Sequence, residues 1–568
     1  MKKTLSIIAI LAVAATACNK VDITPDNGEP APTGKMITEI ITGGQDATTK
    51  VTIDADAKFA WTVGDNVAVH VSNGESHQYV FTSGEGGASA AAATASFTVS
   101  YPDGYSRDAF AVYPSTIVSA SAANYGQSGA TLDVTLPASY TLDEVQGEKF
   151  PCPMIATNTG SNWEFKQLCG LLRLTVKQIP ADALGLIIQF PGRKVNGAFS
   201  IATPVTPESS VIPTAAPATG EDKIVVTFAA GTTEATINIP LPTGDYDDVF
   251  ITPVGSATKV AAVRHIKAGG YTATRARGKK LTTTMVAFSV SASKKVVFAP
   301  GNLWATFEKT SSTWTWSFAP HQYDIIGYGP GNTLVNAHFS LSNNGTVDLF
   351  SFSNNAHYGI KYSQNDTDFT GTDADFWDWG KNSIGGYIPN YWHTLSKDEW
   401  KYVTGRDTFR DTGGTVAGKN NALCTRAIVN GVKGFIIFPD LFSGLTPTGV
   451  NWVTGSIQDG HYDNTLKGWE DDKVATITTV DAWDALEAEG CVFLPVAGTR
   501  LMYVLLYIDG GYGGVTNPTG FYASKNVAPN NSDGVLQDYC LRFNDDGYDP
   551  QNYNLRKYGN SVRLVHEL

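Results

Sequence analysis

Between residues 36 and 285, short β-prone runs alternate with turn-forming residues. The stretch Ala235–Pro240 is typical, because small or apolar residues alternate with polar ones and a proline closes the run. Alternation with a period of two predicts half-buried strands, and strands at this spacing without intervening helices are typical of β-sandwiches. The other strands predicted in this region are 50–54, 66–71, 78–82, 109–114, 130–137, 162–165, 170–176, 223–228 and 249–253.

The composition sets broad limits on size and partners. A chain of 568 residues with 42% hydrophobic residues predicts three or four packed domains. The net charge of -13 argues against nucleic acid as a partner, because phosphate binding needs a basic surface. The cysteines are too few and too scattered for a disulfide framework or a zinc ribbon, and no cofactor is expected. They are Cys18, Cys152, Cys169, Cys424, Cys491 and Cys540, and the last five are interpreted as small buried hydrophobes.

The N-terminus has the features of an export signal. Residues 1–17 combine two lysines with an apolar run that is too short to span a bilayer. The segment Ala15–Cys18 resembles a bacterial lipobox, although Ala15 stands where a larger aliphatic residue is preferred; the resemblance implies that Cys18 carries a lipid. Ordinary cleavage beside a stray cysteine is the alternative. Residues 18–35 are polar and contain three prolines, so we expect a tether to the outer membrane.

A new domain is predicted from residue 288, because ten of the 12 tryptophans lie beyond it. Residues 294–303 and 314–318 are predicted to form an opening hairpin. Ser396–Glu399 has the pattern of a capping box, and Thr479 is a second helix cap ahead of acidic residues. The remaining predicted strands are 434–439, 491–495, 539–543 and 562–565.

Three motifs in the first half resemble those of fimbrillin-like proteins of Bacteroides-type bacteria. They are Trp61–Asp65, Ala111–Pro114 and Phe165–Thr175, and Leu241–Asp245 fits as well. The resemblance implies two tandem β-sandwich subdomains, at 36–161 and 162–287, and a place in or beside a surface pilus. Many polymerising fimbrillins are cut after an arginine near the N-terminus. Here the first arginine is Arg107, which puts such processing, and a role as a bulk stalk subunit, in doubt.

The C-terminal part resembles the C-type-lectin-like fold shared by formylglycine-generating enzymes and diversified variable proteins of bacteria. The matching segments are His393–Trp400, Val492–Gly498, Leu541–Phe543 and Gly559–Val565. Phe521–Ser524 matches a further family motif only in part. The resemblance implies an α+β ligand-binding domain over residues 288–568. The sugar-and-calcium signature of animal lectins is absent, because no aspartate follows Val450–Val453.

The candidate binding site is the tail, where eight of the 24 tyrosines fall between Tyr503 and Tyr558. Tyrosine, asparagine and glycine are the mixture that recognition loops use, and loops between two buried strands lie at the surface. Core packing of several tyrosines is the alternative. The candidate ligand-binding residues are Tyr503, Tyr507, Tyr512, Tyr522, Asn530, Asn531, Tyr548, Asn552 and Tyr553. Replacing Tyr512 and Tyr522 with alanine is expected to weaken attachment while thermal unfolding barely changes.

Other candidate chemistry is weaker. Formylglycine-generating enzymes use a cysteine pair near the end of this fold, but Cys491 and Cys540 lie in apolar strands where a reactive thiolate is disfavoured. The acidic loop 366–378 could bind calcium, but it lacks an EF-hand pattern, so a solvated loop is the preferred interpretation. The aromatic run Phe376–Trp379 could stack a sugar, and core packing explains it at least as well.

The sequence therefore predicts a mainly β protein: two tandem β-sandwich subdomains followed by an α+β C-type-lectin-like domain. The predicted function is a lipid-anchored cell-surface adhesin or ligand-display protein that binds a surface glycan or protein. A pilus tip or accessory subunit, beside other pilus subunits, is the place considered for it. It is not expected to be an enzyme. A structural fimbrial subunit and an enzyme on the formylglycine-generating fold are the alternatives. An exposed, protease-sensitive joint is predicted near residues 284–294.

Overall fold

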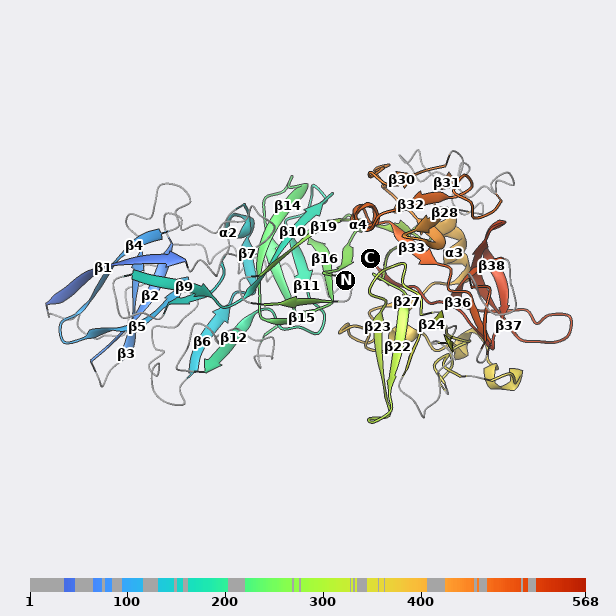
Figure 1. Ribbon diagram of the computed structural model, residues 1–568, viewed down its shortest axis with the longest axis horizontal. Coiled ribbons are helices and arrows are strands. Elements are labelled where there is room, and N and C mark those ends of the chain that lie inside the picture. The colour runs from blue at the N-terminus through green and yellow to red at the C-terminus, as the bar shows by residue number, and fades with distance from the viewer. Residues whose placement is uncertain are drawn as a thin grey trace.

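In the computed structural model, the chain is an elongated molecule with three parts (Figure 1). The strands before residue 114 lie at one end, residues 170–284 form the middle, and residues after 287 form the other end. No helix among the described residues is long and apolar enough to cross a membrane. The predicted signal, Cys18 and strand 50–54 lie outside these residues. The structure describes residues 35–45, 65–73, 77–83, 94–115, 131–147, 151–156, 162–202, 220–267, 270–274, 277–326, 328–329, 333–334, 345–355, 357–361, 363–405, 424–453, 457–458, 467–501, 504–508 and 517–568.

A seven-stranded sheet forms the first part, in the order β3-β2-β5-β8-β9-β1-β4. Positions along β4 alternate between buried and more exposed, so Phe97 and Val99 pack with Val67, Val69 and Trp163 in one core. Neighbouring strands are antiparallel except β1 and β9. The strands are β1 (Met36–Gln45), β2 (Asn66–Ser72), β3 (His77–Ser83), β4 (Thr94–Pro102), β5 (Ser106–Tyr113), β8 (Met154–Ala156) and β9 (Asn162–Gln167).

The middle part is a sandwich of two sheets, β14-β10-β19 and β17-β16-β11-β13-β7, which enclose a second core. Leu172 and Leu174 of β10 pack in that core with Leu186 and Ile188 of β11. The strands are β7 (Ser139–Thr141), β10 (Gly170–Lys177), β11 (Gly185–Gln189), β13 (Lys223–Thr227), β14 (Glu234–Leu241), β16 (Asp248–Val254), β17 (Ala262–His265) and β19 (Gly278–Thr284). Two small ribbons, β12 (Gly197–Ala202) with β6 (Thr131–Leu136) and β15 (Gly244–Tyr246) with β18 (Tyr271–Ala273), and the short helix α2 (Leu142–Val145), complete this part.

The two sheet systems do not divide after residue 161, where the sequence analysis placed the boundary. After β5 the chain contributes β7 to the sandwich, where it pairs in parallel with β13. It then returns to the first sheet with β8 and β9, and β9 begins at Asn162. The alternating pattern identifies strands but not their partners, so β9, which pairs with β1 near the start of the first sheet, was predicted to belong to the second subdomain.

The C-terminal part is α+β, with several small sheets around one large core that contains Trp379, Trp392 and Trp400. The beginning and the end of this part are neighbours, because its second strand, β21, pairs with its last strand, β40. Its sheets are β20-β21-β40-β27, β23-β22-β26, β24-β25, β30-β32-β28-β29-β33 with β31 on β28, β35-β34-β39 and β36-β37-β38. The strands of the first three sheets are β20 (Phe288–Ser289), β21 (Lys295–Phe298), β22 (Leu303–Glu308), β23 (Thr313–Phe318), β24 (Tyr328–Gly329), β25 (Thr333–Leu334), β26 (Gly345–Val347), β27 (His393–Thr394) and β40 (Leu564–Glu567).

The predicted hairpin at 294–318 is partly wrong. The hairpin consists of β22 and β23, whereas β21 pairs with the end of the chain. The remaining strands are β28 (Cys424–Val429), β29 (Val432–Ile437), β30 (Val450–Asn451), β31 (Ile457–Gln458), β32 (Ala475–Ile477), β33 (Val492–Pro495), β34 (Thr499–Leu501), β35 (Val504–Leu506), β36 (Gly520–Ala528), β37 (Gln537–Asn544), β38 (Gly547–Leu555) and β39 (Tyr558–Gly559).

Both predicted helices are confirmed. α3 (Lys397–Thr404) begins after Ser396, whose side chain accepts a hydrogen bond from the Glu399 amide while the Glu399 carboxylate accepts one from the Ser396 amide. α4 (Val480–Ala488) begins after Thr479, whose hydroxyl accepts from the Ala482 amide. Two short 3-10 turns, η5 (Asp366–Phe369) and η6 (Asp373–Asp375), lie in the acidic loop, and a third, η7 (Trp379–Lys381), follows it directly.

The segment near residues 284–294 was predicted to be an exposed joint. Its first half is not exposed, because residues 285–288 are buried. Val286 forms a β-bridge with Ala261. Next to it, Phe250 of β16 packs edge-on against Tyr391, Trp392 and His566, with ring centroids 5.2 to 6.3 Å apart. The core of the C-terminal part therefore continues into the sandwich, and the two parts share an apolar interface.

Candidate functional site

The structure separates the predicted site residues into three groups. Tyr503 and Tyr512 lie outside the described residues. Tyr522 and Tyr548 are buried, with exposed fractions of 0% and 4%. The remaining candidates are exposed or half-buried, and they are Tyr507, Asn530, Asn531, Asn552 and Tyr553.

Tyr522 and Tyr548 belong to the core and not to a binding face. The Tyr522 hydroxyl accepts a hydrogen bond from the Asn302 side chain at 2.9 Å and donates one to the Pro495 carbonyl at 3.2 Å. The Tyr548 hydroxyl donates to the Thr404 carbonyl at 3.2 Å. A buried tyrosine is stable when its hydroxyl finds such a partner. The expectation that Tyr522 could be removed without loss of stability is therefore wrong.

The tail contains more strand than the sequence analysis expected. Instead of long loops between two strands, residues 520–555 form the antiparallel sheet β36-β37-β38. Its many Asn, Asp and Gly residues are depleted in strands in general, which is why the pattern indicated loops. Side chains compensate within the core: Asn554 donates to Asn560 at 2.6 Å, and the buried Arg556 donates to the carbonyls of Gln537 and Gly371.

Asn530 and Asn531 lie in the turn between β36 and β37. The Asn531 side chain accepts hydrogen bonds from the amides of Asp533 and Val535, so it holds the turn itself. Tyr507 lies apart from this turn and has a positive φ of 60°. The centroid of its ring lies 5.8 Å from that of Phe521. These three candidates do not form one site with the others in the described residues.

Tyr553 does lie on a surface of suitable chemistry, whereas Asn552, which is paired with the buried Cys540, points to the other side of the sheet. The register of β37 and β38 places Tyr553 opposite Tyr539, so both side chains leave the same side of the sheet, and their rings are 5.5 Å apart. The Lys397 ammonium lies 5.2 Å from the centre of the Tyr539 ring. Tyr553 is 53% exposed. We call the surface formed by Lys397, Asp398, Tyr539, Gln551 and Tyr553 the tyrosine face.

The first turn of α3 is fixed against this sheet by side chains. The Lys397 amide donates to Asn526 of β36 at 3.0 Å, and Gln551 of β38 donates to Asp398 at 3.0 Å. Behind the helix, Lys294 pairs with Glu399 at 2.7 Å. Burial is the largest single effect and opposes ionisation of Glu399, but the hydrogen bonds from Lys294 and the Ser396 amide, together with the nearby lysine charges, lower the pKa of that carboxyl. The tyrosine face is thus built on regular elements with fixed partners, which limits the entropy lost when a ligand binds.

The acidic loop contributes support to this surface. Asp373 accepts hydrogen bonds from the Val527 amide at 2.6 Å and from the Asn526 side chain at 2.9 Å. Asp366 pairs with Lys557, and Asp368 pairs with Lys361. The carboxylates have separate partners, and the described residues contain no group of three or more ligands that could hold a metal. In the aromatic run, Trp379 is buried and Trp377 lies under the Lys381 ammonium at 4.4 Å.

The sequence analysis missed Tyr539 and Lys397 as site residues. Tyr539 was assigned to a core strand, and Lys397 was only part of a helix cap. One signal was present: in a strand, Cys540 pointing inward requires Tyr539 to point outward. What the sequence did not show is that Tyr553 lies opposite, because the register with β38 includes a bulge between Cys540 and Arg542.

The cysteines are buried, and none of the five described forms a disulfide. Burial is the largest cause that raises the pKa of the Cys540 thiol well above its usual range. A nucleophilic cysteine needs a lowered pKa and access to substrate, so Cys491 and Cys540 do not have the setting of a catalytic pair.

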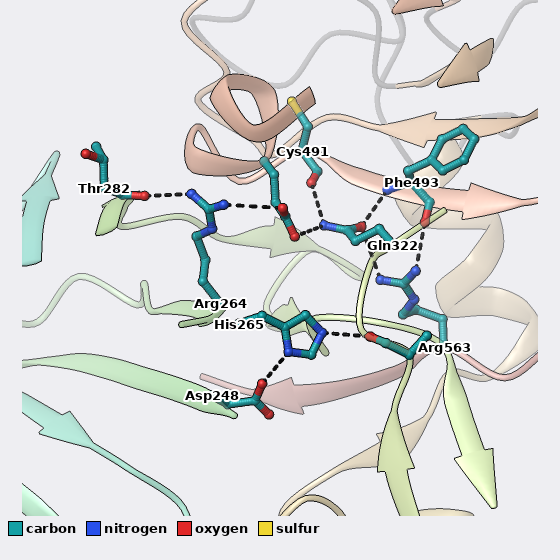
Figure 2. Close-up of polar contacts among 10 residues, drawn as sticks. Asp248, Arg264, His265, Thr282, Gln322, Cys491, Phe493 and Arg563 are labelled. Atoms are coloured by element: carbon teal, nitrogen blue, oxygen red, sulfur yellow. Dashed lines mark hydrogen bonds and ion pairs between the residues drawn. The ribbon is translucent and has the colours of Figure 1, made fainter. Parts of the chain in front are cut away.

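Polar contacts accompany the apolar interface between the sandwich and the C-terminal part (Figure 2). His265 lies between Asp248, 2.6 Å from Nδ1, and the Ala319 carbonyl, 2.8 Å from Nε2. Burial is the largest single effect and lowers the pKa of His265, but the charge and hydrogen bond of Asp248, together with Glu487 and the Ala319 carbonyl, raise the net pKa. Arg264 donates to the Thr282 carbonyl at 2.7 Å and lies 3.3 Å from Glu487 of α4.

Figure 1 shows β37 and β38, the strands that carry Tyr539 and Tyr553, at one end of the molecule. The strands β36, β37 and β38 and helix α3 lie at the end of the C-terminal part that points away from the sandwich and the first sheet. The C-terminus lies on the opposite side of this part, next to the sandwich. There His566 stacks on Tyr391, with ring centroids 4.2 Å apart.

Comparisons with known proteins give remote similarities only. No family model matches the sequence, and no curated protein is similar to it. A solved structure from Bacteroides ovatus, described as a "putative cell adhesion protein", is 14% identical, with a TM-score of 0.29 over 43% of this chain and 91% of that one. The tip fimbrial protein Mfa3 of Porphyromonas gingivalis is 11% identical, with a TM-score of 0.19 over 41% of this chain and 82% of that one.

A fimbrial protein of Bacteroides ovatus aligns over 92% of this chain and 98% of its own, at 9% identity and a TM-score of 0.18. The structures to which this chain is similar are thus fimbrial and cell-adhesion proteins of Bacteroides and Porphyromonas. No TM-score reaches 0.5, so these similarities assign neither the fold nor the function of this chain.

Proposed function

We propose that the chain is a cell-surface adhesin or ligand-display protein that binds its target through the tyrosine face. One observation carries the proposal: an exposed aromatic and polar surface, held by regular elements, lies at the end of an elongated molecule away from its other two parts. Such a position presents a binding surface outward. Tyrosine rings with neighbouring charged and amide groups suit a protein or glycan target.

Surface location and pilus partners form the second part of the proposal. The fimbrillin resemblance of residues 36–285 favours a place in or beside a pilus, and the Cys18 motif favours a lipid anchor in the outer membrane. Replacing Cys18 with alanine should move the protein from the membrane fraction to the soluble fraction. If labelled fatty acid does not enter the wild-type chain, the lipid anchor is excluded.

Attachment of cells that display the full chain tests the binding surface. The double variant Tyr539→Ala/Tyr553→Ala should weaken attachment, because loss of an aromatic anchor at the centre of an interface costs about 2 kcal/mol or more. Ile388→Ala is the control, since Ile388 is 69% exposed in the same part of the chain but lies outside the tyrosine face. Equal attachment of the double variant and the control, with both folded and displayed, would place the site elsewhere.

The variant Tyr507→Ala separates two parts of the originally predicted surface. Tyr507 is 38% exposed but has no contact with the tyrosine face among the described residues. The proposal expects this variant to attach like wild type. A loss of attachment in Tyr507→Ala alone would favour the segment around residues 503–517 as the binding surface.

A further inference from the structure

A cleft of about 590 Å³ lies between the sandwich and the C-terminal part. One wall is formed by β17 and β19 with the residues that flank them, and the other by α4 and the loop at residues 320–323. Arg264 and Glu487, which pair between the two parts, also line it. Its size falls within the roughly 300–1,000 Å³ of small-molecule sites, which often lie between domains. We call it the interdomain cleft.

The sandwich wall of this cleft is basic. Lys177, Lys267, Lys279 and Lys280 line it, in a chain whose net charge is -13. Within the described residues, Lys177, Lys267 and Lys279 have no ion pair or side-chain hydrogen bond. The carboxylates that line the cleft come from the opposite wall, in the α4 region, so the like charges gathered on the lysine wall favour an anionic group beside that wall.

Two buried N–H donors of residues that line the cleft also lack partners. Arg264 uses its terminal nitrogens for Thr282 and Glu487, but its Nε has no hydrogen-bond partner (Figure 2). The indole Nε1 of Trp483, a residue 1% exposed, has none either. Both atoms are buried away from the open cleft, so an ordered water is the expected partner of each, and they do not bear on what the cleft binds.

The opposite wall is acidic and partly aromatic. Asp484 and Glu489 of the α4 region line the cleft, and neither has an ion pair within the described residues. His321 and Tyr323 line the same side, with stacked rings 4.9 Å apart. Carboxylates accept hydrogen bonds from hydroxyl groups but repel other carboxylates, so this wall suits a ligand that also carries hydroxyl donors.

We propose that the interdomain cleft binds a carboxylated sugar, such as a short oligosaccharide of uronic acids. Its carboxylates would lie against the lysine wall, its hydroxyls would donate to Asp484 and Glu489, and a sugar ring would face the His321–Tyr323 pair. An acidic peptide carries the carboxylates without the hydroxyls and would meet repulsion from the acidic wall. This site is separate from the tyrosine face and does not depend on the proposed function.

The test is calorimetric titration of the full chain with trigalacturonic acid. The triple variant Lys177→Gln/Lys267→Gln/Lys279→Gln should bind at least about tenfold more weakly than wild type, because it loses the charge-assisted contacts of three ammonium groups. The control Lys223→Gln/Lys467→Gln/Lys473→Gln removes the same charge from lysines outside the cleft and should bind like wild type. All six side chains are at least partly exposed, so both variants should fold.

Two further probes decide the ligand class. Maltotriose, which has the hydroxyls without the carboxylates, and triglutamate, which has the carboxylates without the sugar hydroxyls, should each bind at least about tenfold more weakly than trigalacturonic acid. The variant Tyr539→Ala/Tyr553→Ala should bind trigalacturonic acid like wild type. The proposal is overturned if wild type binds none of the probes, if either probe binds as well as trigalacturonic acid, if the triple variant matches its control, or if the tyrosine-face variant loses binding.

Discussion

His265 is held between two acceptors, the Asp248 carboxylate and the Ala319 carbonyl. A neutral imidazole has only one N–H, so both contacts are hydrogen bonds only when the His265–Asp248 pair carries an additional proton. The groups around the pair are Asp247, Arg264, Tyr387 and Glu487. Because Ala319 belongs to the C-terminal part, this proton contributes to holding that part against the sandwich.

A pH dependence follows from the raised pKa of His265. A raised pKa in the folded state means that the contact stabilises the fold fully below the ordinary value of 6.5, and that the stabilisation is lost as pH rises through the folded-state pKa. Wild type should exceed His265→Gln in unfolding free energy by about 2 kcal/mol under mildly acidic conditions, and this difference should shrink above pH 6.5. Urea unfolding of both proteins across this range measures it, and a constant difference would contradict the assignment.

Tyr522 and Tyr553 should respond differently to truncation. Tyr522→Ala leaves a cavity in the core and should cost about 3–5 kcal/mol, and Tyr522→Phe should cost about 1–2 kcal/mol through the hydroxyl contacts with Asn302 and Pro495. Tyr553→Ala should change stability by only about 0.5 kcal/mol. Thermal unfolding of the three variants provides the comparison. If Tyr522→Ala proves as mild as Tyr553→Ala, Tyr522 is not a core residue.

At the scale of single elements, local chemistry predicted the helices well. Ser396 with Glu399 and Thr479 with its acidic neighbours are complete signals within one turn, and both helices begin where these residues indicated. The tail was predicted poorly because its strands are held by side-chain hydrogen bonds between distant residues, such as Arg556 with Gly371. Register and pairing depend on the whole fold, so the composition of residues 503–558 indicated a binding region without showing which tyrosines point outward.

The helix cap of α3 should matter for both stability and the tyrosine face. Ser396→Ala removes the acceptor for the Glu399 amide and should cost about 1 kcal/mol. Because the first turn of α3 positions Lys397 over Tyr539, attachment should weaken as well. Ser532→Ala, in the exposed turn after β36, is the control and should change neither quantity. Unchanged stability in Ser396→Ala would show that the cap does not hold the helix.

For the whole molecule, the apolar contact at Phe250 joins the sandwich to the C-terminal part. The composition change near residue 288 carried no information about contact between the two parts. Which residues are buried at such a contact depends on which surfaces of the two parts meet, and the local sequence pattern does not show this. Two of the three aromatic neighbours of Phe250 lie just before β27, and the third lies in β40, far along the chain.

Phe250→Ala should therefore expose the joint to proteases. Wild type should resist cleavage within residues 285–290, which are largely buried, whereas the variant should be cut there because a large apolar contact is lost. Phe97→Ala is the matched control, since Phe97 is equally buried but lies in the first sheet. Limited proteolysis with mass mapping identifies the site. Cleavage of wild type in this segment would show that the interface opens in solution.

The central claim is that the tyrosine face contacts the target. The most direct measurement is photo-crosslinking of the displayed, attached protein with a photoreactive side chain placed either at position 553 or at position 223 on the sandwich. The account predicts that target material is captured from position 553 and not from position 223. Capture from position 223 alone, or no capture from position 553 in a protein that still attaches, would contradict it.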